Sequence, residues 1–392
     1  MSVLGFVDEG LADLENAGLR RTLRTIDTPI GAVVRVDGRE IVLCCSNDYL
    51  GLANHPALVS ACATAAKEWG AGSGASRLVS GSLGIHEQLE RRLAQLKNSE
   101  DAVLFPTGYM ANIGVITALV GKEDAIVSDQ LNHASIVDGA RLSGAKVFVY
   151  THLDLTEMEK ALIQSRGHRR RLVVTDSVFS MDGDLASLPQ IAALASKHDA
   201  MFVIDDAHGT GVLGSRGQGA TEHWAVDSEV HAVVGTLSKA LGGLGGFVAA
   251  SEAVCDWLRN RARSFIYTTA PPPGVCGTAL AALELLLTEP ERISTLGARC
   301  HQFAEGLREL GLDADPTTPI FPIVIGGAQA TMRVSDKLLE EGYLAVGIRP
   351  PTVPNGTARL RVTLSAAHSQ EQVAGLLESL GTILPPITPL AR

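Results

Sequence analysis

The sequence has no basic tail and no long apolar run. Its 33 Lys and Arg face 43 Asp and Glu, a formal net charge of −10, and the one basic run is Arg169–Arg171. Nucleic-acid-binding proteins usually present a basic face, so that class is disfavoured. The best membrane candidate, Val275–Leu287, is broken by Gly277 and Glu284 and is shorter than the ~20 residues that span a bilayer. We therefore expect neither a nucleic acid nor a membrane as partner.

A metal site and a secretion signal are also missing. None of the six cysteines forms a C-x-x-C pair, so the sequence predicts no zinc site and no disulfide framework. Segment 1–20 is acidic and lacks the basic start and unbroken apolar core of a signal peptide. Its apolar residues Leu4, Val7, Leu11 and Leu14 recur at helical spacing. We expect a helix here and a cytoplasmic protein.

The sequence does contain an alternation of short apolar runs and helical segments. The expected strands are Ala102–Phe105, Ala125–Ser128, Lys146–Tyr150, Leu172–Thr175, Met201–Asp205, Ala232–Thr236 and Gly246–Ala250. Helical patterns between them include Ile136–Leu142, Glu157–Ser165 and Leu188–Lys197. Because the strands are apolar on both sides, the pattern predicts an α/β fold with a mostly parallel sheet covered on both faces.

Three regions are expected along the chain. Segment 1–50 would hold the first helix and a hairpin that turns at Asp37-Gly38, and segment 51–287 would form the large sheet domain. The regular alternation of strand and helix patterns ends before 288, which predicts a smaller α+β domain over 288–392. The elements expected there are Ile293–Leu310, Phe321–Ile325, Ser335–Glu341, Leu360–Leu364 and Glu371–Leu380.

A lysine follows one of the predicted strands. The segment Gly235–Lys239 precedes the glycine-rich Gly242–Gly246, whose glycines permit a tight backbone fold. A lysine at a desolvated site can lose its proton and become an imine-forming amine, and the Thr236 and Ser238 hydroxyls could bind a phosphate. The alternative is a solvated surface lysine beside a flexible turn, which is the usual fate of a lysine.

An acidic residue ends the strand before it. Asp205 follows an apolar run, and His208 comes three residues later. A carboxylate at a buried strand end can pair with a heterocyclic ring nitrogen and keep it protonated, which makes the ring a better electron sink. The alternative is an aspartate that caps the following turn.

Further polar segments follow other strands. Helix onset in Thr107–Asn112 would direct N–H groups at an anion, although ordinary turns look the same. In Asn132–Ser135 the asparagine can cap a helix and His133 could stack on a planar ring or be structural. Asp176–Asp184 is too polar for core, although Asp-Gly is a common turn. The Arg359 and Arg361 side chains share one strand face, where one could clamp a carboxylate or both could be solvated.

In their order and spacing these segments resemble those of the α-oxoamine synthases, which are fold-type I pyridoxal-5′-phosphate (PLP) enzymes of the aminotransferase superfamily. The resemblance covers essentially the whole chain. It is carried by SNDYLGL (46–52), GSGASRLVSGSLGIHEQLE (72–90), NHASIVDGARLSG (132–144), DSVFSMDGD (176–184), DDAHGTGVLG (205–214), GTLSKALGGLGG (235–246) and RPPTVPNGTARLRVTLSAAH (349–368). It implies an aspartate-aminotransferase-like fold with a large, mostly parallel sheet domain and a smaller α+β C-terminal domain.

The resemblance also implies residue roles. Lys239 would hold PLP as a Schiff base, Asp205 would pair with the pyridinium nitrogen, His208 would bind the phenolic oxygen, and His133 would stack on the ring. Further cofactor-binding residues would be Gly108, Tyr109, Ser180, Thr236, Ser238, Thr268 and Thr269, with Thr268 or Thr269 reaching the phosphate of a neighbouring subunit. Substrate-binding residues would be Arg21, Asn47, Arg349 and Arg361, with Arg361 clamping the amino-acid carboxylate.

The implied reaction is the decarboxylative condensation of an amino acid with an acyl-CoA in a homodimer whose sites lie at the interface. Within the family, segment 349–368 favours L-alanine with pimeloyl-CoA, or a pimeloyl-carrier protein, in biotin biosynthesis. The alternative is another member, such as one that joins glycine to acetyl-CoA. The same segment disfavours an aminotransferase or a decarboxylase, and the presence of Lys239 disfavours a non-catalytic partner subunit.

Overall fold

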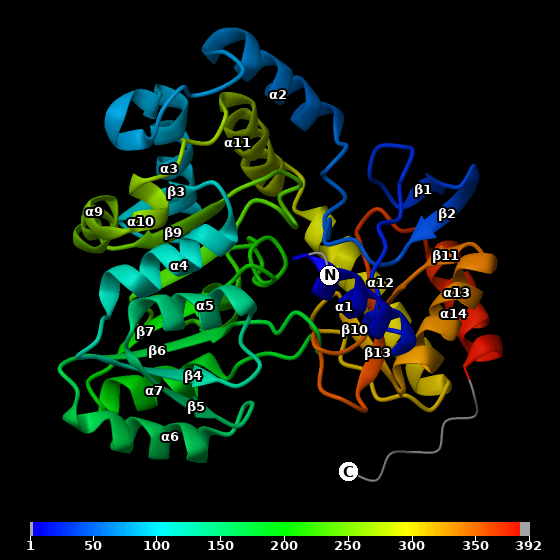
Figure 1. The fold of residues 1–392 in the computed structure, drawn as a ribbon. Coiled ribbons are helices and arrows are strands. Elements are labelled where there is room, and N and C mark those ends of the chain that lie inside the picture. The colour runs from blue at the N-terminus through cyan, green and yellow to red at the C-terminus, as the bar shows by residue number, and fades with distance from the viewer. Residues whose placement is uncertain (1–2, 385–392) are drawn as a thin grey trace. The chain divides into compact units, whose positions relative to one another are not determined.

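The computed structural model describes residues 3–384 (Figure 1). The chain divides into two compact units. The large unit comprises Asn47–Ser180 and Asp184–Thr295, and the small unit comprises the chain up to Ser46, Met181–Gly183, and the chain from Leu296 onward. The N-terminal segment thus belongs to the same unit as the C-terminal part.

The large unit is built on a seven-stranded sheet with the order β3-β9-β8-β7-β6-β4-β5. Its strands are β3 (Asp101–Phe105), β4 (Ala125–Asp129), β5 (Lys146–Tyr150), β6 (Arg171–Asp176), β7 (Met201–Asp205), β8 (Ala232–Thr236) and β9 (Gly246–Ala250). All strand pairs from β5 to β8 are parallel, and β9 runs antiparallel to both of its neighbours. The predicted strands and the mostly parallel sheet are confirmed.

Helices cover both faces of this sheet, as its apolar strands require. The helices of the large unit are α2 (Pro56–Trp69), α3 (Gly84–Leu96), α4 (Gly108–Leu119), α5 (Ala134–Ser143), α6 (Leu155–Gln164), α7 (Leu188–Lys197), α8 (Ala220–Trp224), α9 (Glu252–Arg261), α10 (Arg263–Ile266) and α11 (Pro273–Thr288). Figure 1 shows α4 and α5 on one side of the central strands and α6 and α7 on the other. The core beneath α4 includes the buried side chains of Phe105, Ile116, Ile136 and Val203.

The small unit begins with α1 (Gly5–Asn16) and a hairpin of β1 (Val33–Val36) and β2 (Arg39–Leu43). The hairpin turns at Asp37 and Gly38, whose φ angles of 50° and 76° are those of the tight turn that Asp-Gly favours. β2 pairs in parallel with β11 (Tyr343–Leu344), and this pairing joins the N-terminal hairpin to the C-terminal part of the chain.

A second small sheet has the order β10-β13-β12. Its strands are β10 (Ile320–Gly326), β12 (Val346–Ile348) and β13 (Ala358–Thr363), and the helices of this part of the chain are α12 (Glu291–Glu309), α13 (Ala328–Glu340) and α14 (Gln370–Ile383). Helix α13 begins at Ala328, well before the predicted start at Ser335, because Gly326 and Gly327 end β10 and lead directly into it. The short strands β11 and β12 were not predicted, since two or three residues carry no readable alternation.

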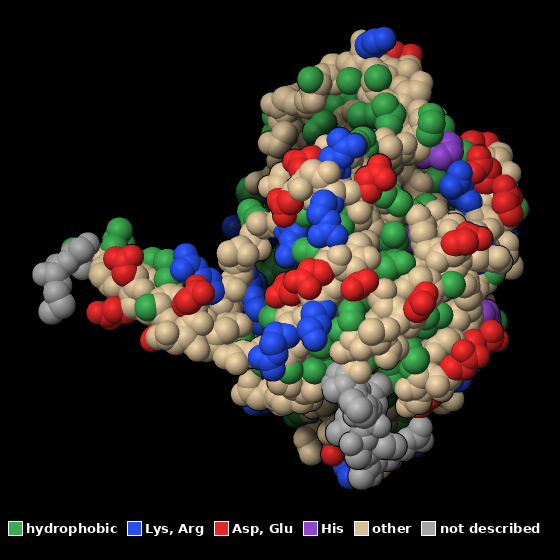
Figure 2. Space-filling model, turned by 90° about the vertical axis from the view of Figure 1, so that its right-hand side faces the viewer, with side chains coloured by type: hydrophobic (Ala, Val, Ile, Leu, Met, Phe, Trp, Pro, Cys, Tyr) green, Lys and Arg blue, Asp and Glu red, His purple; other side chains and the backbone are tan. Residues whose placement is uncertain are grey.

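Among residues 3–384, no helix combines the length and the apolar character needed to cross a bilayer. In the same range, no group of three or more His, Cys, Asp and Glu side chains is arranged to hold a metal ion. On the face shown in Figure 2, Lys and Arg side chains lie interspersed with Asp and Glu side chains.

Candidate active site

Four neighbouring strands of the large sheet lead into polar residues at the same edge. Strands β8, β7, β6 and β4 are adjacent and parallel, so their carboxyl ends lie together, where open α/β sheets bind ligands. Thr236 ends β8, Asp205 ends β7, Asp176 ends β6, and Asn132 follows β4. The β6–β7 register sets Asp176 directly beside Asp205. Residues far apart in the sequence are thereby collected at one place.

Lys239 lies three residues beyond β8 and contacts a histidine. Its Nζ is 2.9 Å from His208 Nε2, and the Tyr49 hydroxyl oxygen is 2.7 Å from His208 Nδ1. The Tyr49 hydroxyl donates its hydrogen to Asn47 Oδ1 at 3.1 Å, so it accepts a hydrogen bond from Nδ1–H of His208. Nε2 is then the acceptor that faces Lys239. His208 is buried and Lys239 is half-buried, so the lysine amine sits in a partly desolvated place.

Asp205 is held in one orientation by its neighbours. Its Oδ2 accepts a hydrogen bond from Asn112 Nδ2 at 2.5 Å, and its Oδ1 accepts one from the Ala207 N–H at 2.9 Å. Asn112 also donates to Ser135 Oγ at 2.9 Å. Asn112 was not singled out from the sequence, although a buried amide within the apolar helix α4 was a usable signal.

Asp176 adds a second acidic group to this edge. Burial raises the pKa of its carboxyl above the ordinary value, and the charge of Asp205 on the next strand raises that pKa further. Its Oδ2 accepts a hydrogen bond from the His133 N–H at 2.7 Å. Two buried carboxyl groups on neighbouring strands favour a cationic ligand atom beside them.

The start of α4 lies close to the last residue of β8 and the first residue of β9. A Cβ on Gly108 would lie 3.5 Å from the Thr236 side chain, and one on Gly246 would lie only 2.4 Å from the Thr107 carbonyl oxygen. Thr107 caps α4 by accepting from the Met110 N–H at 3.2 Å. The first N–H groups of a helix have no partner inside it, and Gly108 and Tyr109 are the first two residues of α4.

The remaining large-unit candidates surround this edge. His133 caps α5, its Nδ1 lies 2.7 Å from Ser135 Oγ, and its side chain is exposed. Ser238 is exposed and exchanges hydrogen bonds with Gly245, whose carbonyl also accepts from the Thr236 hydroxyl at 2.8 Å. The other positions are Ser180, half-buried after β6, and Thr268 and Thr269, half-buried and exposed respectively after α10.

The predicted arginines lie in the small unit. Arg359 and Arg361 are both buried on β13. Arg359 forms an ion pair with Asp182, which gives this arginine a structural partner. Of the two, Arg361 is the one predicted to bind a carboxylate.

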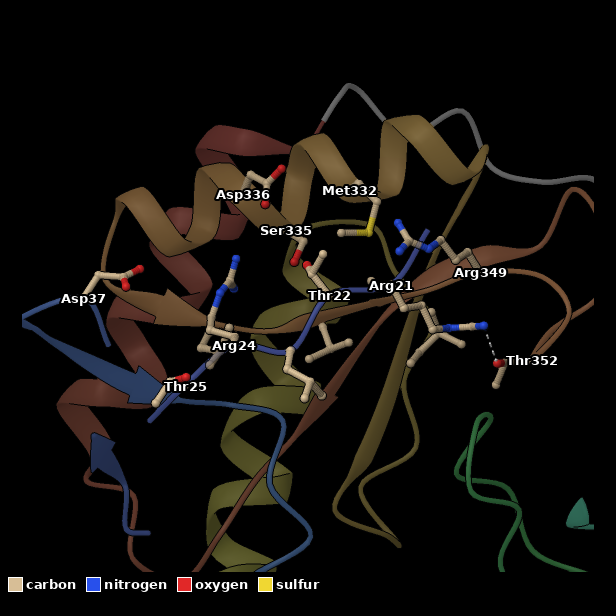
Figure 3. Close-up of a pocket in the computed structure, with 15 residues that line it drawn as sticks. Arg21, Thr22, Arg24, Thr25, Asp37, Met332, Ser335, Asp336, Arg349 and Thr352 are labelled. Carbon is tan, nitrogen blue, oxygen red and sulfur yellow. Dashed lines mark hydrogen bonds between the residues drawn. The ribbon is translucent and has the colours of Figure 1, made fainter. Parts of the chain in front are cut away.

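Arg21 and Arg349 line a single pocket of about 640 Å³ within the small unit (Figure 3). Arg21 Nη2 donates to Thr352 Oγ1 at 3.3 Å, and Arg349 Nη2 donates to the Arg20 carbonyl at 2.7 Å. Arg24 also lines the pocket. Thr352 was not predicted as a site residue, because a threonine among prolines reads as a turn.

A buried ion pair lies directly behind Asp205. Lys97 Nζ is 2.7 Å from both Asp206 Oδ2 and Thr210 Oγ1, and the side chains of Lys97 and Asp206 are 0% exposed. Asp206 Oδ1 accepts a hydrogen bond from Ser177 Oγ at 2.7 Å. The pair therefore joins α3, the residues after β6 and the residues after β7.

A histidine bridges two carboxylates at the other end of the same edge. His152 Nδ1 is 2.9 Å from Asp129 Oδ1, and Nε2 is 2.9 Å from Asp184 Oδ2. Burial alone lowers the pKa of His152, but the two carboxylates outweigh it and raise that pKa to about 10. His152 is therefore an imidazolium at neutral pH.

Comparison with known proteins places the chain in a family. The aminotransferase class I and II family matches residues 39–380. The 8-amino-7-oxononanoate synthase of Symbiobacterium thermophilum is 46% identical over 385 residues, with 98% of both chains covered. That of Nitrosococcus oceani is 49% identical over 376 residues, with 95% of this chain and 100% of the relative covered.

Solved structures agree with this fold. A serine palmitoyltransferase from Sphingomonas wittichii superposes with a TM-score of 0.91 at 31% identity, covering 98% of both chains. One from S. paucimobilis with a bound PLP-myriocin aldimine gives a TM-score of 0.92 at 28% identity, with the same coverage. The chain belongs to the aminotransferase class I and II family and has the fold of a fold-type I PLP-dependent transferase. The predicted fold class and family resemblance are confirmed.

The Lys97–Asp206 pair predicts a large loss of stability for Lys97→Met. The substitution leaves the Asp206 charge buried without its counter-ion, which costs about 3–5 kcal/mol. The matched control is Lys197→Met, because Lys197 forms an ion pair with Glu159 at the same 2.7 Å distance but is 64% exposed. That variant should lose less than about 1 kcal/mol. Urea unfolding of both variants measures the difference, and equal losses would contradict the account.

The raised pKa of His152 predicts a pH window. Because the folded pKa of about 10 exceeds the ordinary 6.5, the stabilisation is complete below pH 6.5 and is lost as pH rises toward 10. The difference in unfolding free energy between wild type and His152→Gln should therefore shrink steadily across that window. Chemical denaturation at several pH values tests this, and a difference independent of pH would show that His152 is not ionised.

Proposed function

We propose that this protein is a PLP-dependent acyltransferase that condenses L-alanine with pimeloyl-CoA, or with pimeloyl-carrier protein. The products are 8-amino-7-oxononanoate, carbon dioxide and the free thiol carrier, in biotin biosynthesis. The observation that carries the proposal is the contact of Lys239 Nζ with His208 Nε2, beside the oriented carboxylate of Asp205. Similarity supports these substrates, because full-length relatives that are 46% and 49% identical to this chain are 8-amino-7-oxononanoate synthases.

The residues at the sheet edge fit PLP. The close approach of Gly108 to Thr236 forms a cradle next to helix N–H groups, which suits a phosphate. Asp205 and Asp176 form an acidic position that suits a protonated ring nitrogen. Lys239 supplies the amine for the aldehyde, and exposed His133 offers a face on which a ring can stack. When bound, PLP serves as the electron sink for negative charge at the amino-acid Cα.

Lys239 and His208 are the residues proposed to carry out proton transfer. Lys239 Nζ, as a neutral amine, would take the proton from the amino-acid Cα and later return one. His208 Nε2 accepts a hydrogen bond from Lys239, which steers the amine, while Tyr49 holds the other ring nitrogen. The family resemblance also assigns the phenolic oxygen to His208, which would bind it in place of the contact between Nε2 and Lys239.

Other residues orient what is bound. Asn112 and the Ala207 N–H fix the Asp205 carboxylate in one orientation, in which it would pair with the protonated ring nitrogen. Arg361 would clamp the amino-acid carboxylate, with Asn47 nearby, and so decide which bond of Cα stands perpendicular to the ring. Ser180 would approach the ring or its phenolic oxygen.

The arginine pocket of the small unit supports the acyl end of the proposal. Arg21, with Thr352 as its hydrogen-bond partner, presents a cation that matches the free carboxylate of a pimeloyl chain. Arg349 lines the same pocket and would bind substrate there as well.

We also propose that the enzyme is a cytoplasmic homodimer. The family resemblance supports sites at the dimer interface, where Thr268 or Thr269 would reach the phosphate bound by the partner subunit. Both threonines follow α10 and are at least partly exposed, as such a role requires.

The test is release of free CoA thiol from the PLP-loaded protein. Pimeloyl-CoA, acetyl-CoA and succinyl-CoA are each offered with L-alanine, glycine or L-serine in separate reactions. Release that strongly favours L-alanine is expected. Release only with glycine, or only with acetyl-CoA or succinyl-CoA, would keep the family and overturn the substrate pair. No release with any pair would overturn the acyltransferase proposal.

Lys239→Ala should reduce CoA release by more than about a hundredfold, because the variant has no amine to move the Cα proton. It should still bind PLP without a covalent link, since the phosphate cradle and Asp205 are unchanged. The matched control is Lys146→Ala, an exposed lysine on β5, which should keep full activity. Appreciable turnover by Lys239→Ala would show that another group is the base.

A further inference from the structure

A short hairpin between β6 and α7 carries Ser180. Val178 pairs with Leu185, and the Phe179 N–H donates to the Asp184 carbonyl at 3.0 Å. The Ala186 N–H donates to the Ser177 carbonyl at 3.0 Å. Phe179 and Asp184 therefore form the neck of the hairpin, and Ser180 is the first residue of its tip.

His152 contacts one residue on each side of this neck. Its Nε2 is 2.9 Å from Asp184 Oδ2, and its ring packs edge-on against Phe179 with the ring centroids 4.4 Å apart. Its Nδ1 is anchored on Asp129 at the end of β4. Asp129 is itself fixed, because it accepts hydrogen bonds from the N–H groups of Leu131 and Leu153 at 2.8 and 2.9 Å.

The charge of Asp184 depends on this contact. Its other carboxylate oxygen, Oδ1, is buried with no hydrogen-bond partner among the described residues, while the side chain as a whole is 38% exposed. A buried carboxylate oxygen without a partner is costly unless a counter-charge lies close by. The imidazolium of His152 supplies that charge, so its loss would leave the neck held by its backbone pairs alone.

We propose that His152 is a positioning residue for the cofactor site, because its bridge from Asp129 to Asp184 fixes the hairpin tip that presents Ser180. The inference rests on the proposed function for its cofactor. The described contacts of His152 are with Asp129, Asp184 and Phe179, so it would act through the 177–186 hairpin. The edge of the sheet is thereby braced at β4 as well as at β7 and β8.

The variant His152→Gln tests the inference. Glutamine is neutral and cannot hold both carboxylates as an imidazolium does, so the hairpin should loosen. Loss of one charge-assisted hydrogen bond is a change of about tenfold in an equilibrium constant. We expect the dissociation constant for PLP, measured by titrating the apoprotein, to rise about tenfold. Hydrogen exchange of the 177–186 amides in the apoprotein should accelerate.

The matched control is His198→Gln. His198 also lies against a carboxylate, with Nε2 3.2 Å from Glu159 Oε1, and is more buried than His152, but it caps α7 at the end away from the hairpin. This variant should keep the wild-type PLP affinity and the slow exchange of the hairpin. Asp184→Asn is the second probe: it should loosen the hairpin as His152→Gln does, and the double variant should be little worse than either single one.

Two results would overturn the inference. One is wild-type PLP affinity and hairpin exchange in His152→Gln. The other is the same loss in His198→Gln, which would mean that PLP affinity follows global stability. Neither readout uses an acyl donor, so a wild-type protein that binds PLP but releases no CoA would defeat the proposed function and leave this test intact.

Discussion

The parallel pairing of β4, β6, β7 and β8 is the constraint on which the site depends. Parallel neighbours bring their carboxyl ends to one edge, and the register puts Asp176 beside Asp205 with Thr236 on the next strand. Lys239, His208, Asp205, Asp176, Thr236 and His133 all follow or end these strands. Lys239 and His208 meet because β8 and β7 are adjacent, although 31 positions separate them in the chain.

This edge concentrates buried charge, and the surrounding structure compensates it. Asp206 is neutralised by Lys97, and Asp129 and Asp184 are bridged by His152. Asp205 and Asp176 lie side by side, and burial together with the charge of Asp205 raises the pKa of the Asp176 carboxyl. A protonated ring nitrogen beside Asp205 would offset this repulsion, which is the physical reason that the edge suits such a ligand.

Much of this could be predicted from the sequence. Short apolar runs predicted the seven strands of the large sheet. Polar residues after those strands pointed to Lys239, Asp205, His208 and His133 as site candidates. The partners Asn112, Tyr49 and Thr352 were not found, because their importance comes from tertiary neighbours that spacing does not reveal. His152 was missed for the same reason: a lone histidine after a strand gives no sign of the two carboxylates that meet it.

One strand pairing was also beyond the sequence. The N-terminal hairpin has its own turn signal, but nothing in it indicates that β2 pairs with β11 some 300 residues later. Such a long-range pairing leaves no local pattern. The predicted start of α13 was wrong for a different reason. The helix begins with small residues after two glycines, and its apolar spacing becomes visible only from its middle.

The central claim is that Lys239 is the residue that holds PLP. The most direct measurement is to load the protein with PLP, reduce the carbon–nitrogen double bond with borohydride, digest the protein, and map the modified lysine by mass spectrometry. The account predicts a phosphopyridoxyl group on the peptide that contains Lys239. Stoichiometric modification of another lysine, or none at all, would contradict it.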